Sequence, residues 1–170
     1  MASMRRLVSA GILVALSIAW PAAADPLPAH ADEIVTYTIV ATLDAATHTV
    51  TATERVTWHN PSDAPVGELW LHLYLNAFRN TRSTFMRESH GQLRDIEMPP
   101  NGWGWIDLTR LTLTDGIDLL ARATFESPDD GNPDDRTVMR VRLPRPVPAG
   151  GEVAFEAHLL FQVREDALDH

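Results

Sequence analysis

The chain has 170 residues and a formal net charge of -9, with 14 Lys and Arg against 23 Asp and Glu. This acidity argues against nucleic acid or an anionic membrane as a partner, because binding phosphates requires clustered Lys and Arg. The chain has no cysteine, which excludes disulfides, thiolate metal sites and a lipid-modified cysteine anchor. The fold must therefore be held together by a hydrophobic core.

The N-terminus has the three-part layout of a secretory signal. Arg5 and Arg6 precede the uncharged apolar stretch 7–20, and small alanines follow it. The stretch is shorter than the roughly 20 residues that a membrane-spanning helix needs. We therefore predict a signal peptide at 1–24, a flexible mature N-terminus at 25–32, and export to the periplasm or the medium. The arginine pair leaves the twin-arginine route open beside the general secretory route.

Cleavage after Ala24 would leave 146 residues (170 minus 24) with a charge of -11, since Arg5 and Arg6 are removed. Ala31 is a second cleavage site that fits. A chain of this length is enough for one domain that buries roughly two-thirds of its unfolded surface. The negative charge is then expected to keep an exported protein soluble.

The first half of the mature chain alternates with the period of a strand. Residues 34–43 and 49–58 place apolar and Thr-rich positions on opposite faces, and 44–47 has turn chemistry, so we expect an antiparallel hairpin. Next, 69–76 places four leucines on one face, which predicts a strand covered on both sides. Its other face carries Trp70, His72, Tyr74 and Asn76.

The second half continues in the same way and shows no sustained helical period. Further strands are expected at 108–113, 117–125, 137–143 and 153–163. About seven short strands separated by Pro, Gly and Asp turns predict an all-β fold, specifically an antiparallel β-sandwich over 33–163. Residues 164–170 are expected to form a charged tail.

Two segments interrupt the strands. Residues 78–100 form a long polar connection with a short helical piece near 85–88, and loops of this length are usually functional or packed as a lid. The second segment, 127–135, is an acidic turn region. It offers oxygen ligands of the type that calcium prefers, but it lacks the glycine and glutamate positions of an EF-hand loop. Calcium binding stays open beside an ordinary exposed turn. The oxygen donors are Asp129, Asp130, Asn132, Asp134 and Asp135.

The sequence contains no complete catalytic motif. No histidine is followed by glutamate, so H-E-x-x-H is absent, and no serine stands in a G-x-S-x-G turn. Glu54 and Glu156 are strand carboxylates that could pair as acid and base. Such groups more often face solvent or meet a cross-strand arginine such as Arg55. The sequence therefore favours a protein that is not an enzyme on its own.

A histidine metal site assembled from separate strands is the remaining route to a bound ion. His48, His59 and His158 all fall on strand faces that also carry Thr, Arg or Glu. Their spacing supports no site, and surface or interface histidines are the simpler interpretation. We expect no catalytic residue, no bound metal and no cofactor in this chain.

Four aromatic residues are candidates for an interface. Trp70 and Tyr74 are expected to share one face of a strand, and Trp103 and Trp105 flank a glycine after the long connection. Large aromatic side chains form sugar-binding platforms and the centres of protein interfaces, and they also fill ordinary cores.

Three segments resemble the N-terminal domain of bacterial zinc metallopeptidases of the aminopeptidase N family. They are the run Leu71–Glu88, the entry hairpin Tyr37–Glu54 and the connection Pro128–Val138, and the resemblance spans about Glu33 to Phe161. It implies a saddle-like β-sandwich that packs beside a thermolysin-like catalytic domain. That catalytic domain would hold the zinc and a G-x-M-E-N segment, and neither G-x-M-E-N nor H-E-x-x-H occurs in this chain.

The resemblance therefore implies a metallopeptidase truncated before its catalytic domain. The expected partner is a separately encoded or lost catalytic domain, with neither nucleic acid nor membrane as a partner after signal cleavage. The alternative is a free-standing secreted β-sandwich module that binds carbohydrate or protein, through Trp70, Trp103 and Trp105.

Overall fold

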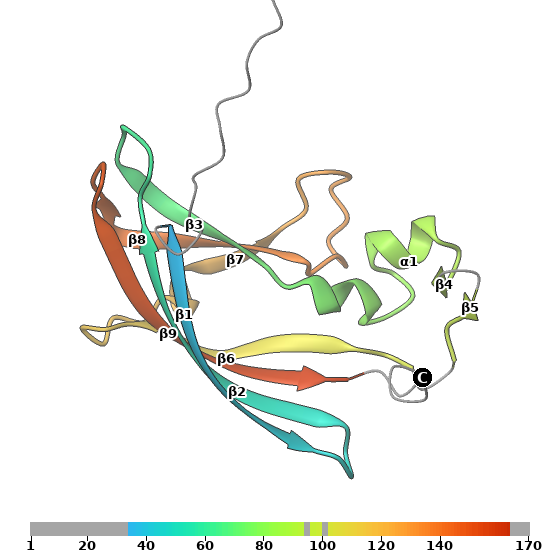
Figure 1. Cartoon of the computed structure of the whole chain (residues 1–170). Helices are drawn as coiled ribbons and strands as arrows, with labels where there is room; N and C mark the ends of the chain where they lie inside the picture. The colour runs from blue at the N-terminus through green and yellow to red at the C-terminus, as the bar shows by residue number, and fades with distance from the viewer. Residues whose placement is uncertain (1–33, 94–95, 100–101, 164–170) are drawn as a thin grey trace, which may run out of the picture.

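The computed structural model describes residues 34–93, 96–99 and 102–163 (Figure 1). The predicted signal peptide at 1–24, the mature N-terminus at 25–32 and the charged tail at 164–170 lie outside the described residues. No helix in the described parts of the chain is long and apolar enough to cross a membrane.

The larger sheet contains four long strands in the order β1-β2-β9-β6, all antiparallel to their neighbours. These strands curve together across the molecule (Figure 1). Their apolar residues alternate with polar ones, so one face of the sheet points toward the core and the other toward solvent. The strands are β1 (Val35–Asp44), β2 (Thr49–His59), β6 (Trp105–Leu113) and β9 (Glu152–Gln162).

The smaller sheet has the order β3-β8-β7 and is also antiparallel. Its strands are β3 (Val66–His72), β7 (Ala123–Glu126) and β8 (Val138–Val147). The two-residue strands β4 (Gln92–Leu93) and β5 (Ile96–Glu97) pair antiparallel with each other. Short helices occupy the connections: the 3-10 helices η2 (Tyr74–Phe78) and η3 (Leu120–Arg122), and the α-helix α1 (Thr84–Glu88).

The core lies between the inner face of the larger sheet and the smaller sheet. Phe155, Ala157 and Val56 from the larger sheet join Met139 and Val141 from the smaller one in a single buried cluster. Full burial of a large apolar side chain such as Val141 or Phe155 contributes about 1.5–3 kcal/mol of transfer free energy. Because the chain has no cysteine, burial of these side chains holds the two sheets together without a disulfide.

The predicted all-β, antiparallel fold is confirmed, and so are the first hairpin and the short helix near 85–88. The finer prediction of a sandwich stays a prediction.

The predicted strand 69–76 is wrong at its C-terminal end, because β3 stops at His72 and η2 follows. The side chain of Asn76 explains the change of direction: its Oδ1 accepts from the backbone N–H of Ile106, and its Nδ2 donates to the carbonyl of Arg136. Nor is the strand covered on both sides, since β3 is an edge strand and Trp70 is 46% exposed.

The predicted strand 117–125 is also largely wrong. Asp118 Oδ1 accepts from the backbone N–H groups of Leu120 and Ala121, which turns the chain into η3. Only Ala123 to Glu126 pair as a strand. A carboxylate that bonds the backbone two residues on is a common local competitor of strand pairing.

Candidate docking groove

An open apolar groove of about 710 Å³ runs along the inner face of the larger sheet. Its floor is formed by alternate residues of β2 and β9, among them Ala52, Ala157 and Leu159. The segment that ends β3 and begins η2 forms the opposite wall, from Trp70 to Leu75. A volume of this size falls in the range of ligand and peptide binding sites.

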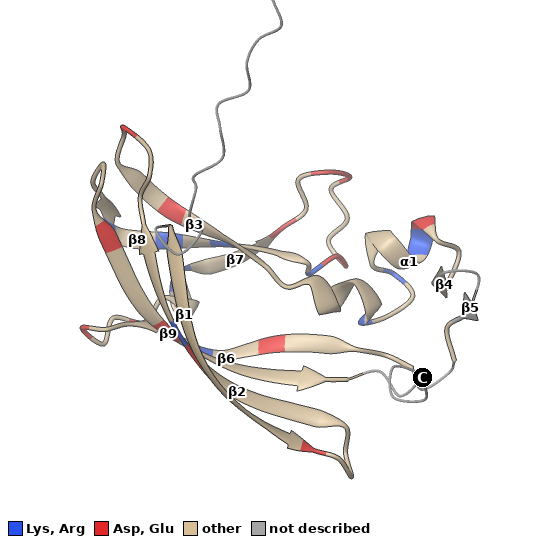
Figure 2. Cartoon of the chain, in the orientation of Figure 1, with Lys and Arg blue, Asp and Glu red and all other residues tan. Residues whose placement is uncertain are grey.

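The outer wall of the groove is β1, whose apolar side chains remain exposed. Every residue of β1 after Val35 is exposed. Tyr37, Ile39 and Leu43 are 58%, 58% and 57% exposed although they lie on the inward face. The strand carries no basic residue, and its one acidic residue, Asp44, is its last (Figure 2). The sheet thus presents apolar surface beyond the part that its own core covers.

Trp70 and Tyr74, two of the four predicted interface residues, line this groove. They do so from different elements, because Trp70 lies in β3 and Tyr74 begins η2, so the prediction that they share one strand face is wrong. Tyr74 is 73% exposed, and its ring stacks on His72 with the ring centroids 5.1 Å apart. The guanidinium of Arg140 lies over the Trp70 ring at 5.9 Å.

The other two predicted residues, Trp103 and Trp105, are both half-buried and are not among the groove-lining residues. Trp105 alternates along β6 with Ile106, which does line the groove, so the two side chains point to opposite faces. The guanidinium of Arg79 lies 5.6 Å from the Trp105 ring and also bonds Asp107 at 2.6 Å. The four aromatic residues therefore do not form one continuous platform.

Glu54 is the one carboxylate among the residues that line the groove. In the sheet it lies directly opposite Ile39 on one side and Ala157 on the other. Its side chain has no hydrogen bond or ion pair to any residue that the structure describes. Burial among these apolar neighbours raises the pKa of Glu54, because desolvation disfavours the charged form.

Glu156 lies on the opposite face of the sheet and cannot act with Glu54 as an acid–base pair. Its neighbour Arg55 approaches it at 3.6 Å across β2 and β9, which is the cross-strand pairing that the sequence favours for such carboxylates. A hydrogen bond from the His158 ring at 3.1 Å, followed by the charges of His158 and Arg55, lowers the pKa of Glu156. This cluster is a solvent-exposed surface network.

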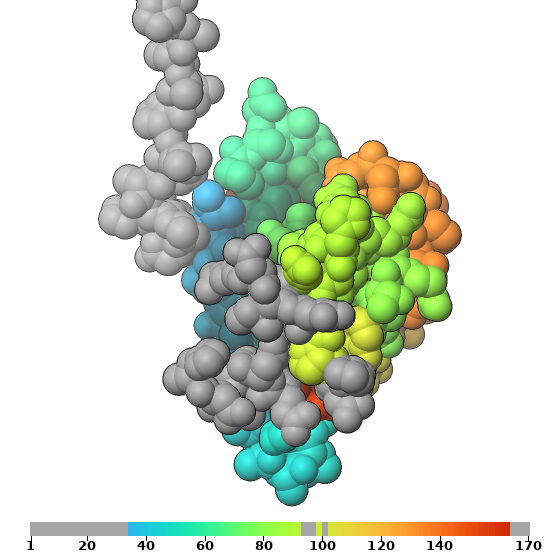
Figure 3. Space-filling view, turned by 90° about the vertical axis from the view of Figure 1, so that its right-hand side faces the viewer, coloured from blue at the N-terminus to red at the C-terminus, as the bar shows by residue number. Residues whose placement is uncertain are grey.

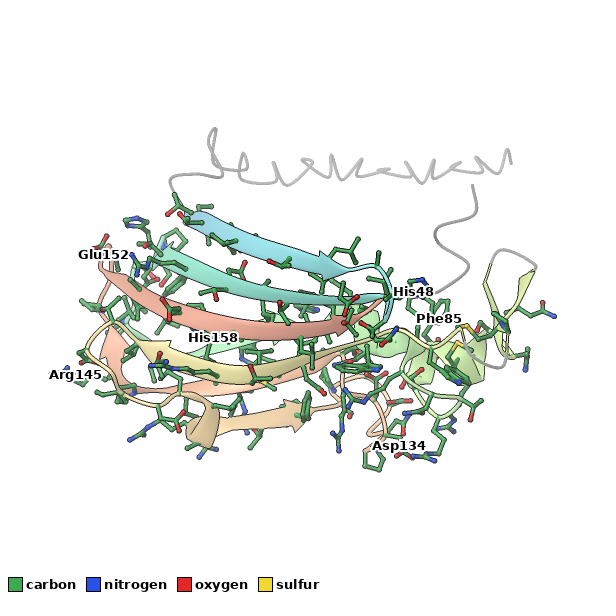
Figure 4. The ribbon with its side chains drawn as sticks, turned by 90° about the horizontal axis from the view of Figure 1, so that it is seen from below. His48, Phe85, Asp134, Arg145, Glu152 and His158 are labelled. Carbon is green, nitrogen blue, oxygen red and sulfur yellow. The ribbon has the colours of Figure 1, made fainter. Side chains whose placement is uncertain are left out.

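The three histidines expected on strand faces do not meet. His48 lies in the turn just before β2, so its expected place on a strand face is wrong, and His59 is the last residue of that strand. About 36 Å separates the two at the usual rise per residue. Figure 4 shows His48 at one end of the sheet, His158 partway along it, and Glu152, which lies 3.6 Å from His59, at the other end. One ion cannot bind all three rings.

The acidic loop uses its carboxylates to hold its own backbone and α1. Asp135 accepts from the backbone N–H groups of Thr84 and Thr137 at 3.1 and 2.8 Å, and Asp130 accepts from the Thr84 hydroxyl. The loop and α1 lie side by side at this end of the molecule (Figure 3). Burial opposes ionisation of Asp135, but these hydrogen bonds win and lower its pKa. Within the described ranges, no three His, Asp or Glu side chains gather as a metal site.

The groove residues that the sequence interpretation missed are Glu54 and the β1 residues Tyr37, Ile39 and Ala41. The sequence did contain a signal for Glu54, because Glu54 lies on the same face of β2 as Ala52 and Val56, where the alternation otherwise places apolar residues. The sequence contains no such signal that the β1 residues are exposed, because a strand whose apolar face is covered shows the same alternation.

The fold and the groove define an all-β domain whose larger sheet leaves part of its apolar inner face exposed among the described residues. The sequence matches none of the protein-family models, and no curated protein matches it.

Proposed function

We propose that this chain is a non-catalytic domain that docks on a protein partner through the groove. The observation that carries the proposal is the exposed apolar wall that Tyr37, Ile39 and Ala41 of β1 form, among the described residues, in the same groove as the exposed residue Tyr74. Contiguous apolar patches are rare on the surfaces of soluble monomers and mark interaction sites. Aromatic residues are enriched at the centres of such interfaces.

Glu54 sets the chemistry that the partner must bring. A partner that fills the groove removes the remaining water from this carboxylate, and an unpaired buried charge is strongly unfavourable. The partner surface therefore needs an apolar contact area with a basic side chain or another hydrogen-bond donor that reaches Glu54.

The resemblance to the N-terminal domain of aminopeptidase N metallopeptidases supports a metallopeptidase catalytic domain as the partner. Zinc and the catalytic residues would then belong to the partner. Export from the cytoplasm is part of the same proposal.

A first experiment measures Nile red fluorescence, which rises when this uncharged dye enters an apolar site. Ala41→Glu places a charge in the groove wall, whereas Val40→Glu places the same charge on the outer face of the same strand. We expect the wild type and Val40→Glu to bind the dye and Ala41→Glu to lose most of the signal. Equal dye binding by both variants would show that the apolar surface lies elsewhere.

A second experiment identifies what occupies the groove in producing cells. A photo-cross-linking phenylalanine analogue replaces Tyr74 in the groove, and in the control it replaces Phe125, which is also exposed but lies outside the groove. We expect a cross-linked protein partner at position 74 and none at 125. Equal cross-linking at both positions, or none at 74, contradicts the docking proposal.

Absence of catalysis is tested on the purified chain. We expect neither stoichiometric zinc nor hydrolysis of amino-acid anilides. Stoichiometric zinc with turnover would overturn the non-catalytic proposal whatever the outcome at the groove.

A carbohydrate-binding module is the second candidate, favoured by Trp70 and Tyr74, two exposed aromatic residues that line the groove. The positions of Trp103 and Trp105 outside the groove reduce the platform that the sequence suggested. Glycan-array binding that is lost in Trp70→Ala and kept in Trp103→Ala would favour this candidate over protein docking.

A further inference from the structure

Among the described residues, the strand β1 is an unpaired edge of the larger sheet and lacks the usual protection of an edge. It is ten residues long, contains no proline, lysine or arginine, and follows β2 in register without a bulge. Natural edge strands are normally short, bulged, charged or covered by another segment, because an open edge offers unpaired backbone groups to any other strand.

The other long edges are protected. In β6 the register shifts between Leu108 and Arg110, and the backbone N–H of Leu119 donates to the carbonyl of Leu111 at 2.8 Å. The Asn76 side chain accepts from the N–H of Ile106 on the same strand. In the smaller sheet, β3 has a register shift next to Glu68, and β7 has only four residues. Among the described edge strands, β1 is therefore the one that is long and lacks such protection.

The hydrogen-bond pattern identifies which backbone groups of β1 point outward. The N–H of His59 donates to the carbonyl of Ile34 at 2.8 Å, and the register places these two residues opposite each other. Hydrogen-bonded and non-bonded pairs alternate in an antiparallel ladder. Even-numbered residues of β1 therefore bond β2, and odd-numbered residues direct their N–H and C=O away from it.

Bonds on the other side of β2 agree with this assignment. The N–H of Asn60 donates to the carbonyl of Gly151, and the N–H of Val163 donates to the carbonyl of His48. The backbone groups of even-numbered residues at both ends of β2 thus bond β9. The backbone groups of its odd-numbered residues are therefore the ones that bond β1.

The outward-facing residues of β1 form a self-complementary set. They are Val35, Tyr37, Ile39, Ala41 and Leu43, and they are symmetric about Ile39. A second copy placed antiparallel, with a two-fold axis at Ile39, pairs Val35 with Leu43, Tyr37 with Ala41, and Ile39 with itself. Every outward N–H and C=O then has a partner, and the large Tyr37 ring meets the smallest side chain of the set.

We propose that two copies of this chain associate through β1, forming one continuous antiparallel sheet across a two-fold axis at Ile39. Charge does not oppose this pairing, because the only charged residue of β1 is Asp44. In this register Asp44 lies opposite Ile34 and not opposite its own copy. An isologous contact of this kind closes at a dimer and leaves no further β1 edge open.

The dimer is independent of the docking function proposed above. Backbone groups of β1 point in the plane of the sheet, whereas the groove is lined by residues whose side chains lie on the inner face of the sheet. If the chain is a monomer but position 74 still cross-links to a protein partner, only the dimer proposal is refuted. If the chain dimerises but position 74 does not cross-link, only the docking proposal is refuted.

Sedimentation equilibrium of the purified chain over a range of concentrations tests the association. We expect a reversible monomer–dimer equilibrium for the wild type and a monomer for Ile39→Pro. Proline removes an N–H that faces outward and therefore breaks no bond to β2. Thermal unfolding of Ile39→Pro verifies that it is folded.

A cysteine cross-link tests the register and does not depend on the proline variant. The chain has no natural cysteine. Opposed residues in a hydrogen-bonded antiparallel pair have Cα atoms about 5.5 Å apart, a separation that a disulfide spans. We expect mild oxidation to convert Ile39→Cys to a disulfide-linked dimer, and Ala41→Cys, which does not oppose itself, to stay unlinked.

Three outcomes overturn the proposal. The first is a wild-type monomer at every concentration, with Ile39→Cys unlinked. The second is a dimer that persists unchanged in folded Ile39→Pro. The third is a monomer in which the outward β1 amides resist hydrogen exchange, because another segment of the same chain would then cover the edge.

Discussion

Asn76 connects three separate segments, and its replacement is the sharpest test of how this fold is held. The residue is 1% exposed. Its Nδ2 donates to the Arg136 carbonyl at 2.9 Å, and its Oδ1 accepts from the Ile106 N–H at 3.0 Å. A longer bond of 3.4 Å comes from the Arg79 guanidinium. These bonds fix η2 against β6 and against the chain that enters β8.

In Asn76→Ala the N–H of Ile106 and the carbonyl of Arg136 lose their side-chain partner. A buried backbone group left without a hydrogen bond destabilises a protein by about 1–3 kcal/mol. The bond to the Arg136 carbonyl is only partly buried and contributes about 1 kcal/mol, and the longer Arg79 bond adds little, so the expected loss is about 2–4 kcal/mol in the free energy of unfolding. For a domain of this size, 1 kcal/mol shifts the melting temperature by about 3 °C, which predicts a decrease of about 6–12 °C.

Urea unfolding followed by tryptophan fluorescence gives the free energy, and calorimetry gives the melting temperature. Asn80→Ala is the matched control, because Asn80 lies in the same connection and its side chain accepts a solvent-exposed hydrogen bond from the backbone N–H of Arg82. This control is expected to lose less than about 1 kcal/mol. A loss at Asn76 no larger than the loss at Asn80 would refute the reasoning.

Three further substitutions test the core and two carboxylates with shifted pKa values, Glu54 and Asp135. Leu119→Ala, at a fully buried position, is expected to lose about 2–5 kcal/mol in urea unfolding, and a loss below about 1 kcal/mol would place it outside the core. Glu54→Gln should be more stable than the wild type at pH 7. The raised pKa of Glu54 means that the wild type loses stability as pH rises above its ordinary value of 4.5. The gain should vanish in more acid solution, and a gain that is independent of pH would contradict the assignment. Asp135→Ala should lose about 1–3 kcal/mol at pH 7. Because the pKa of Asp135 is lowered, its contribution is present above 3.8 and falls in more acid solution, so the difference from wild type in pH-dependent melting should shrink there.

The strands could be predicted where the period-two alternation is strong and the pairing is local. The hairpin of β1 and β2 is predicted nearly to its ends, because only a short turn separates two runs of alternating residues. The last strand, β9, is predicted for the same reason although its partners are distant. Alternation does not specify which strands become neighbours.

Prediction failed where a single side chain bonds a distant or competing backbone group. Leucines alternate through position 75, yet β3 ends at His72 because Asn76 bonds Ile106 and Arg136, which are far away in sequence. Predicted interface residues were located only in part, since Trp70 and Tyr74 line the groove and Trp103 and Trp105 do not.

The sequence by itself determined the all-β class, because side-chain alternation follows from the geometry of a strand and requires no partner. It also excluded disulfides and the zinc motif H-E-x-x-H, since these depend only on which residues are present. Among the described residues, tertiary structure alone decided that the inner face of β1 stays exposed, that Glu54 lies among apolar side chains, and that β1 is a sheet edge. The first two depend on how far the smaller sheet extends over the larger one, and the third depends on which strands pair side by side. Both are long-range properties that no local pattern encodes.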